Sequence, residues 1–398
     1  MNLMIAFNQN ELRVLFVVDV FPPSICGIGD YSFELARALV SQGVQVGVVT
    51  KAAANASEHE VVDGIDIYRV AGRWSLRDMA KIRTIAREMG PGTVVHVQYP
   101  SLTNYYRRPT INLLPALFRT VQRSNPMIVT MHGFHEHRLR WRLRALPMMW
   151  INSAIVYVHP RDQEMARRWA PLSTRRSTLI PIASNVPALA PDLGRRSRVR
   201  AELGIGEGEH VAVFFGEVRP DKGVQHLLAA AEDMHRRGIK ARAVIVSTIG
   251  THDFALNEYE KHILSRLEVG TREGWALLAR AETPVRAAEI LQASDLAAFP
   301  FTMGAAENRG SLMAAVVNAV PVLTTRGVST PPDYETTYGA ETVPANEPAR
   351  FAARLETLLC STEDRAAVKA KAEAAAGRFS WGKIAEQTIE VYRQCLTS

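Results

Sequence analysis

Two cationic side chains stand in a short loop between a predicted strand and a predicted helix. The run FGEVRPDKG covers residues 215–223 and contains Arg219 and Lys222. An arginine guanidinium can bind a phosphate through two parallel hydrogen bonds, and a lysine ammonium acts as a compact positive charge. Because the loop leads into a helix N-terminus, whose free amides attract anions, we expect it to bind a diphosphate. The alternative is that both cations are ordinary solvated surface charges.

A second candidate anion site follows the first predicted strand, in the run PPSICGIGDY at residues 22–31. Gly27 and Gly29 have no Cβ, so a ligand can approach the amides at the start of the next helix closely. Ser32 stands where a dinucleotide fingerprint has its third glycine, and the second predicted strand ends without an acidic residue. A nicotinamide site is therefore disfavoured. The alternative is that both glycines only form a tight strand-to-helix turn.

A histidine ends another predicted strand, in the run TMHG at residues 130–133. At this position His132 can donate a hydrogen bond to a sugar hydroxyl or stabilise developing charge. His96 and Gln98, in the run VVHVQYP, belong to the end of another predicted strand, and the same functional role is considered for them. For all three residues the alternative is a structural role at the edge of the sheet.

The run PFTMGAAENRGS at residues 300–311 leads from a later strand into a helix. We expect Asn308 to cap this helix, and Ser311 and the free amides to meet ligand oxygens. Glu307 can bind sugar or ribose hydroxyls, and Arg309 belongs to the same predicted nucleotide-binding set. The alternative for Glu307 is that it only favours the positive end of the helix.

Elements that could position these residues alternate along the whole chain as short β-branched runs and helical patterns, which is typical of parallel βαβ units. We predict an α/β protein of two Rossmann-like doubly wound domains facing a central cleft, because ligands bind beyond the carboxyl ends of such strands. The predicted domains are 1–185 and 186–379, followed by a C-terminal helix within 380–398 that packs back on the first domain. The proline-punctuated stretch 181–198 is predicted to be the linker.

Composition excludes several classes of protein. The chain has 398 residues, of which 47% are hydrophobic and 22% charged, so disorder, collagen and a coiled coil are disfavoured. Its three cysteines, Cys26, Cys360 and Cys395, lie far apart and suggest neither a zinc site nor a disulfide framework. We predict no secretion signal and no membrane-spanning segment, since the most apolar later stretch, 145–158, is too short. A reducing, cytoplasmic location is the expectation.

Positive charge is concentrated in the first half. Residues 1–190 hold 22 Lys and Arg against 13 Asp and Glu, whereas the whole chain has a net charge of +7. This excess favours phosphates or an anionic membrane surface as partners, and no nucleic-acid motif accompanies it. One interpretation of the arginine-rich stretch 138–150 is a peripheral contact with the inner face of a membrane. An ordinary amphipathic helix with its arginines in water is the reading we favour, because the arginines do not share one face.

Several separate segments resemble glycosyltransferase family 4, whose members are retaining GT-B enzymes that use nucleotide sugars. The resemblance covers nearly the whole chain, and its segments are PPSICGIGDYSFELARALVSQG, HVQYP, TMHG, FGEVRPDKGVQHLLAA, LQASDLAAFPF, RGSLMAAVVNAVPVLTT and FSWGKIAEQTIEVY. It implies that the Gly27 and Gly29 amides face the donor phosphates and that His132 contacts the transferred sugar. It also implies that Lys222, with Arg219, holds the diphosphate.

The chain departs from the family pattern at two places. Glu217 stands where the usual loop has an arginine, and Arg219 fits a variant of that loop. The family's paired glutamates, seven residues apart, align with Ala306 and Ala314, so Glu307 would have to substitute for the first from one position away. The family's usual contact with the donor ribose is therefore not predicted at these two positions.

The resulting prediction is a glycosyltransferase that moves a sugar from a nucleotide-sugar donor to a sugar, lipid-linked or small-molecule acceptor. We expect no cofactor and no metal, because the chain lacks a DxD-type tripeptide and cations with helix amides can neutralise the leaving diphosphate. Two alternatives stay open: a noncatalytic nucleotide-sugar-binding protein, and a nucleotide-sugar epimerase or phosphorylase of the same architecture.

Overall fold

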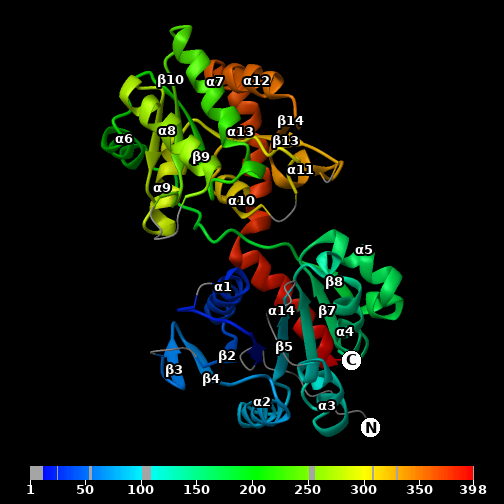
Figure 1. The fold of residues 1–398 in the computed structure, drawn as a ribbon. Helices are drawn as coiled ribbons and strands as arrows, with labels where there is room; N and C mark the ends of the chain where they lie inside the picture. Colours follow the sequence, from blue (N-terminus) through cyan, green and yellow to red (C-terminus); the bar gives the residue numbers. More distant parts are fainter. Residues whose placement is uncertain are drawn as a thin grey trace. The chain divides into compact units, whose positions relative to one another are not determined.

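The computed structural model describes residues 12–24, 26–52, 56–100, 109–250, 256–306, 309–328 and 330–397. The chain divides into two compact α/β units, each built on its own sheet (Figure 1). Unit 1 comprises Met1–Ile182 and Trp381–Ser398, and unit 2 comprises Ala183–Ser380. Both units are Rossmann-like, as the alternation of strands and helices predicts. The sequence-based boundaries fall after residues 185 and 379.

Unit 1 contains an eight-stranded sheet in the order β3-β4-β2-β1-β5-β6-β7-β8. All neighbouring strands are parallel except β3 and β4, so the sheet has a single antiparallel edge hairpin among the described residues. The strands are β1 (Arg13–Val17), β2 (Gln45–Lys51), β3 (His59–Val62), β4 (Ile65–Ala71), β5 (Val94–Tyr99), β6 (Met127–Met131), β7 (Ala154–Tyr157) and β8 (Ser177–Leu179).

The helices of unit 1 connect these strands, and the last of them comes from the far end of the chain. They are α1 (Gly27–Ser41), α2 (Leu76–Glu88), α3 (Leu114–Val121), α4 (Leu139–Trp150), α5 (Pro160–Trp169) and α14 (Trp381–Thr397), with the short 3-10 turns η2 (Pro109–Leu113), η3 (Phe134–Glu136) and η4 (Pro171–Arg176). α14 packs against α1 within unit 1.

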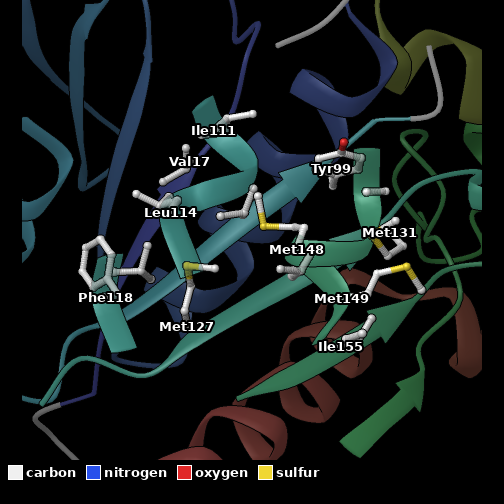
Figure 2. Packing of buried hydrophobic residues seen from close by; sticks show 14 of the residues in the cluster. Val17, Tyr99, Ile111, Leu114, Phe118, Met127, Met131, Met148, Met149 and Ile155 are labelled. Carbon is white, nitrogen blue, oxygen red and sulfur yellow. The ribbon is translucent and has the colours of Figure 1, made fainter. Parts of the chain in front are cut away.

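The core of unit 1 includes methionines from two neighbouring elements. Met127 and Met131 come from β6, and Met148 and Met149 come from the inner face of α4 (Figure 2). Unbranched thioether side chains fill irregular gaps between a sheet and a helix. This packing fixes α4 on the sheet and explains why the helix forms despite Pro147 within it.

Unit 2 contains a six-stranded sheet in the order β11-β10-β9-β12-β13-β14, and all of its pairs are parallel. Its strands are β9 (His210–Phe215), β10 (Ala241–Val246), β11 (Ala276–Ala279), β12 (Leu296–Phe299), β13 (Val322–Arg326) and β14 (Glu341–Pro344). Its helices are α6 (Leu193–Glu202), α7 (Val224–Arg236), α8 (Glu258–Glu273), α9 (Pro284–Ala293), α10 (Gly310–Val317), α11 (Tyr334–Tyr338), α12 (Pro348–Cys360) and α13 (Thr362–Ala376), with the 3-10 turns η5 (Pro220–Lys222) and η6 (Gly377–Phe379).

The predicted linker at 181–198 is wrong in its second half, because α6 begins inside it. The Asp192 side chain accepts a hydrogen bond from the Arg195 amide and so caps the helix. Arg196 and Arg200 then reach Asp295 at 2.6 Å and 3.4 Å. These long-range ion pairs fasten α6 to unit 2, and the proline count of the stretch gave no sign of them.

Candidate active site

The loop between β9 and α7 packs tightly on the segment that follows β12. Gly223 has φ +68°, and a Cβ at this position would lie 1.9 Å from the carbonyl oxygen of Pro300. The Thr302 amide also donates to the carbonyl oxygen of Asp221 at 3.1 Å. Only glycine fits this close approach. The two loops that the sequence singled out in unit 2 therefore form one surface.

Three cations of these loops converge on the carboxylate of Asp221. The Arg219 Nε lies 3.1 Å from Oδ1, and Lys222 Nζ and Arg309 Nη1 lie 3.9 Å and 3.8 Å from Oδ2. Arg219 also pairs with Glu217 at 3.5 Å. An internal carboxylate thus occupies the kind of position that an anionic ligand oxygen would take.

The aromatic ring of Phe301 lies against two of the cations, Lys222 and Arg309. Lys222 Nζ lies 5.4 Å from the ring centroid and the Arg309 guanidinium carbon lies 4.6 Å from it, both within range of a cation–π interaction. The ring is fully buried. Phe301 and Asp221 were not singled out from the sequence, since a phenylalanine after a strand and an acid in a loop are ordinary features there.

Burial changes the electrostatics of both supported cations. It lowers the pKa of Lys222, and the neighbouring positive charge of Arg309 lowers it further. Burial likewise lowers the pKa of the Arg309 guanidinium. Partly desolvated cations gain free energy when a negative charge binds beside them. The pair is therefore prepared for an anion, whereas Arg219, with a side chain 59% exposed, is a solvated cation at the rim.

The N-terminus of α10 adjoins the same surface. Its N-cap residue is Arg309 and not Asn308, so the predicted cap is wrong, and no side-chain hydrogen bond caps the helix among the described residues. Ser311 lies against Gly216, where a Cβ would meet the Ser311 Cβ at 3.6 Å and Oγ at 3.8 Å. The structure thus brings together Arg219, Lys222, Arg309 and Ser311. The remaining predictions for this loop, Glu307 and Asn308, lie outside the described residues.

Both positions that align with the family's glutamates carry alanine. Ala314 is fully buried in α10, where its carbonyl oxygen accepts from the Asn318 side chain at 2.9 Å. The Ala306 carbonyl oxygen accepts from the Tyr334 hydroxyl at 3.2 Å. Neither side chain offers a hydroxyl group an acceptor, so the usual ribose contact is absent at these two positions.

In unit 1 the predicted glycines lie within the first turn of α1. Cys26 is the N-cap residue, and no side-chain hydrogen bond caps the helix. A Cβ at Gly29 would lie 2.6 Å from the Val20 carbonyl oxygen, whereas a Cβ at Gly27 would meet nothing within 4 Å. Gly29 is therefore explained by packing, while the absence of a side chain at Gly27 leaves open space beside the helix N-terminus.

His132 is held at the carboxyl end of β6. Its backbone amide donates to the Tyr99 carbonyl at 2.9 Å, and its Nε2 lies 2.8 Å from Gln98 Oε1. The Tyr31 ring packs edge-on against the imidazole at 5.0 Å. An amide oxygen only accepts, so the imidazole carries its proton on Nε2 and keeps a lone pair on Nδ1. Burial lowers the pKa of His132 to about 4, which keeps the ring neutral near pH 7.

The two polar residues of β5 that the sequence singled out, His96 and Gln98, have internal partners. His96 is fully buried, with Nδ1 2.7 Å from the Tyr392 hydroxyl of α14 and Nε2 2.7 Å from Thr130 Oγ1. It therefore ties α14 to the sheet, which is the structural role left open by the sequence. Gln98 instead fixes the ring of His132.

The described residues contain no cluster of three or more histidine, cysteine or acidic side chains arranged to hold a metal ion. No helix within the described ranges is both long and apolar enough to cross a bilayer.

Comparison with known families assigns both halves of the chain. Residues 26–182 match the model of a glycosyl transferase 4-like domain, and residues 195–375 match that of the glycosyl transferases group 1. The chain belongs to the GT-B glycosyltransferases of family 4 type. The cation surface described above lies in the group 1 domain, and His132 lies in the 4-like domain.

Curated proteins similar in sequence to the chain are D-inositol 3-phosphate glycosyltransferases. The protein of Nocardia farcinica is 30% identical over 231 residues, which are 56% of this chain and 48% of the relative. That of Segniliparus rotundus is 28% identical over 212 residues, 51% of this chain and 44% of the relative. The chain thus spans about half the length of the curated relatives that it matches.

Solved structures share the fold at low sequence identity. A glycosyltransferase of Rickettsia africae is similar with a TM-score of 0.73 and 11% identity, covering 97% of this chain and 99% of its own. HepE of Anabaena in complex with UDP-glucose is similar with a TM-score of 0.65 and 16% identity, covering 96% of this chain and 100% of its own. These likenesses establish the GT-B fold.

Proposed function

We propose that the protein transfers a sugar from a nucleotide-sugar donor to an acceptor, and that unit 2 binds the donor diphosphate. The observation that carries the proposal is the pair Lys222 and Arg309, both partly desolvated over Phe301 and both facing the single carboxylate of Asp221. A diphosphate supplies the negative charge that this pair lacks. Arg219 and Ser311, with the α10 amides, contribute further donors.

These groups act on the leaving group of the reaction. As the anomeric bond breaks, negative charge accumulates on the diphosphate and positive charge on the sugar ring. Cations fixed before the reaction stabilise the departing charge without reorganising, and one such donor lowers the activation barrier by roughly 2.7–4 kcal/mol. We therefore propose that no divalent metal takes part, and that no cofactor is needed beyond the donor itself.

His132 is proposed to contact the transferred sugar. Its Nε2 proton is engaged by Gln98, so the Nδ1 lone pair is the group that accepts a hydrogen bond from a sugar hydroxyl. The family resemblance further implies retention of anomeric configuration and a contact between the donor phosphates and the amides of Gly27 and Gly29. Donor ribose recognition would differ from the family pattern, because Ala306 and Ala314 offer no carboxylate.

A thermal-shift screen with nucleotide sugars, followed by transfer assays on the ligands found, tests this proposal. A ligand that binds only the folded protein raises the unfolding temperature. Lys222→Ala should abolish both the shift and turnover, whereas Lys261→Ala, an exposed lysine of α8 paired with Glu258, should change neither. Binding without transfer to any acceptor would favour a noncatalytic binder, and a rearranged or phosphorolysed donor would favour an epimerase or phosphorylase.

A membrane contact through α4 is the second proposal, and it is favoured by the outer face of the helix. Leu139, Leu143 and Trp150 are 61%, 52% and 55% exposed, and their spacing places them on one side of α4. Exposed Leu113 of η2 and Leu172 of η4 belong to elements that contact α4. Residues 109–176 hold eleven arginines against three acids. Apolar residues among cations suit an anionic bilayer surface.

Co-sedimentation with vesicles tests the α4 surface. Leu143→Ser should weaken binding to phosphatidylglycerol vesicles, and Leu193→Ser, at an 82% exposed leucine of α6, should leave it unchanged. Equal binding by both variants and the parent, or no preference for anionic over zwitterionic lipid, would show that the arginines merely solvate an ordinary amphipathic helix.

A further inference from the structure

A fully buried carboxylate stands in the first turn of α5. Asp162 has an exposed fraction of 0%, and it follows the N-cap residue His159 by three positions. An acid at this place favours the positive end of the helix. The helix terminus does not account for its other contacts.

The carboxylate of Asp162 is committed to the turn that follows His132. Its Oδ2 accepts from the Gly133 amide at 2.9 Å, and its Oδ1 accepts from the amide and from Nδ1 of His135, both at 2.7 Å. Gly133 has φ +81°, a left-handed conformation in which the chain turns immediately after His132. Hydrogen bonds to an ionised acceptor are roughly twice as strong as neutral ones. A single side chain therefore fixes both sides of this turn.

Neighbouring groups stiffen the same turn. The His135 ring stacks on that of His159 at 4.5 Å, and His159 Nδ1 accepts from the Arg161 amide at 3.0 Å. Arg142 of α4 donates to the His135 carbonyl oxygen at 2.9 Å. The turn, α4 and the start of α5 thus form one connected assembly around the carboxylate of Asp162.

We propose that Asp162 is a positioning residue for His132: by clamping the amides of Gly133 and His135, it sets the direction of the imidazole that meets the transferred sugar. The inference rests on the proposed function of His132. Gln98 fixes the ring at Nε2 and the Tyr99 carbonyl holds the His132 amide, while Asp162 holds the backbone immediately after His132. The negative charge of Asp162 also raises the pKa of His132, against the larger effect of burial.

Asp162→Asn tests the clamp. The amide nitrogen of asparagine cannot accept a hydrogen bond, so one of the two backbone amides loses its partner. A displacement of about 1 Å at a reacting group can lower the rate roughly hundredfold, and we expect a loss of this order in kcat with KM for the donor little changed.

Asp78→Asn is a matched control. Asp78 is also buried, also lies three residues after an N-cap, and accepts from the Gly72 amide at 3.3 Å and the Ser75 amide at 2.8 Å. It clamps the loop after β4 rather than the turn after β6. We expect a comparable fall in unfolding temperature with kcat retained. Equal kcat losses in the two variants would overturn the proposal.

An NMR titration of the His132 ring gives a readout that needs no activity. In Asp162→Asn the His132 signals should move and its pKa should fall below the parent value, whereas Asp78→Asn should leave both unchanged. If the parent transfers no sugar but His132 responds in this way, the proposed function fails and the clamp stands. Unchanged His132 signals overturn the clamp. Should Asp162→Asn not fold, Gly133→Ala disturbs the same turn and must move the His132 signals; because it retains the Asp162 charge, the fall in pKa is expected only in Asp162→Asn.

Discussion

Replacing Gly29 or Gly27 with alanine should separate a packing glycine from a binding glycine. The added Cβ at Gly29 would lie 2.6 Å from the Val20 oxygen and 3.3 Å from the Phe21 Cα, so α1 or the preceding loop must move by about 0.8 Å to restore ordinary contact. Forcing such an overlap costs about 1–3 kcal/mol, and the better helix propensity of alanine offsets up to about 1 kcal/mol of that. At Gly27 only the gain in helix propensity applies, since a Cβ added there would meet no atom within 4 Å.

Thermal unfolding of the two variants without ligand measures this difference. A change of 1 kcal/mol shifts the unfolding temperature of a unit of this size by about 2–4 °C, so Gly29→Ala should unfold several degrees below Gly27→Ala. Donor titration then tests the binding role: Gly27→Ala should raise KM for the nucleotide sugar because the methyl group occupies the space beside the free amides. Equal unfolding temperatures would refute the packing argument, and an unchanged KM would refute the phosphate contact.

Three further predictions follow from the charges and burial. Lys222→Gln should lower kcat by roughly 100–1000-fold in a transfer assay, as expected for one lost transition-state donor, while Lys261→Gln retains the parent rate. In the folded protein the pKa values of His96 and His132 are about 3 and about 4, whereas in the unfolded chain both residues are protonated below about pH 6.5. The free energy of unfolding should therefore fall on acidification by about 1 kcal/mol per pH unit for each histidine. His96→Gln should flatten this slope, which urea unfolding between pH 7 and pH 5 measures. Excess EDTA should leave turnover unchanged, and loss of activity restored by Mg²⁺ or Mn²⁺ would contradict a metal-independent site.

Strand and helix patterns predicted much of the fold because both sheets are mostly parallel and their strands are continuous apolar runs. Met127–Met131 and Ala241–Val246, for example, are continuous apolar runs apart from one polar residue each, and both form strands. The strands β3, β11 and β14 lie at the edges of the sheets, and their four residues each carry too little periodicity to predict a strand. α6 was missed because its stability comes from ion pairs with Asp295, about a hundred residues away.

The candidate site shows the same division between local and distant information. Arg219, Lys222 and Ser311 could be found from loops between a strand and a helix, where anion sites recur. The support that Phe301 gives to Lys222 and Arg309 could not, because it depends on how two loops pack. Asp162 had a local signal, the Pro160 and acid typical of a helix start, but its hold on the turn after His132 spans almost thirty residues.

A crystal structure of the protein with UDP or ADP bound tests the account at its centre. The diphosphate should lie within hydrogen-bonding distance of Lys222 Nζ and the Arg309 guanidinium, taking over the interactions that both now make with Asp221. A nucleotide bound with its phosphorus atoms far from Lys222, and with the Asp221 contacts intact, would contradict the assignment of this surface as the donor site.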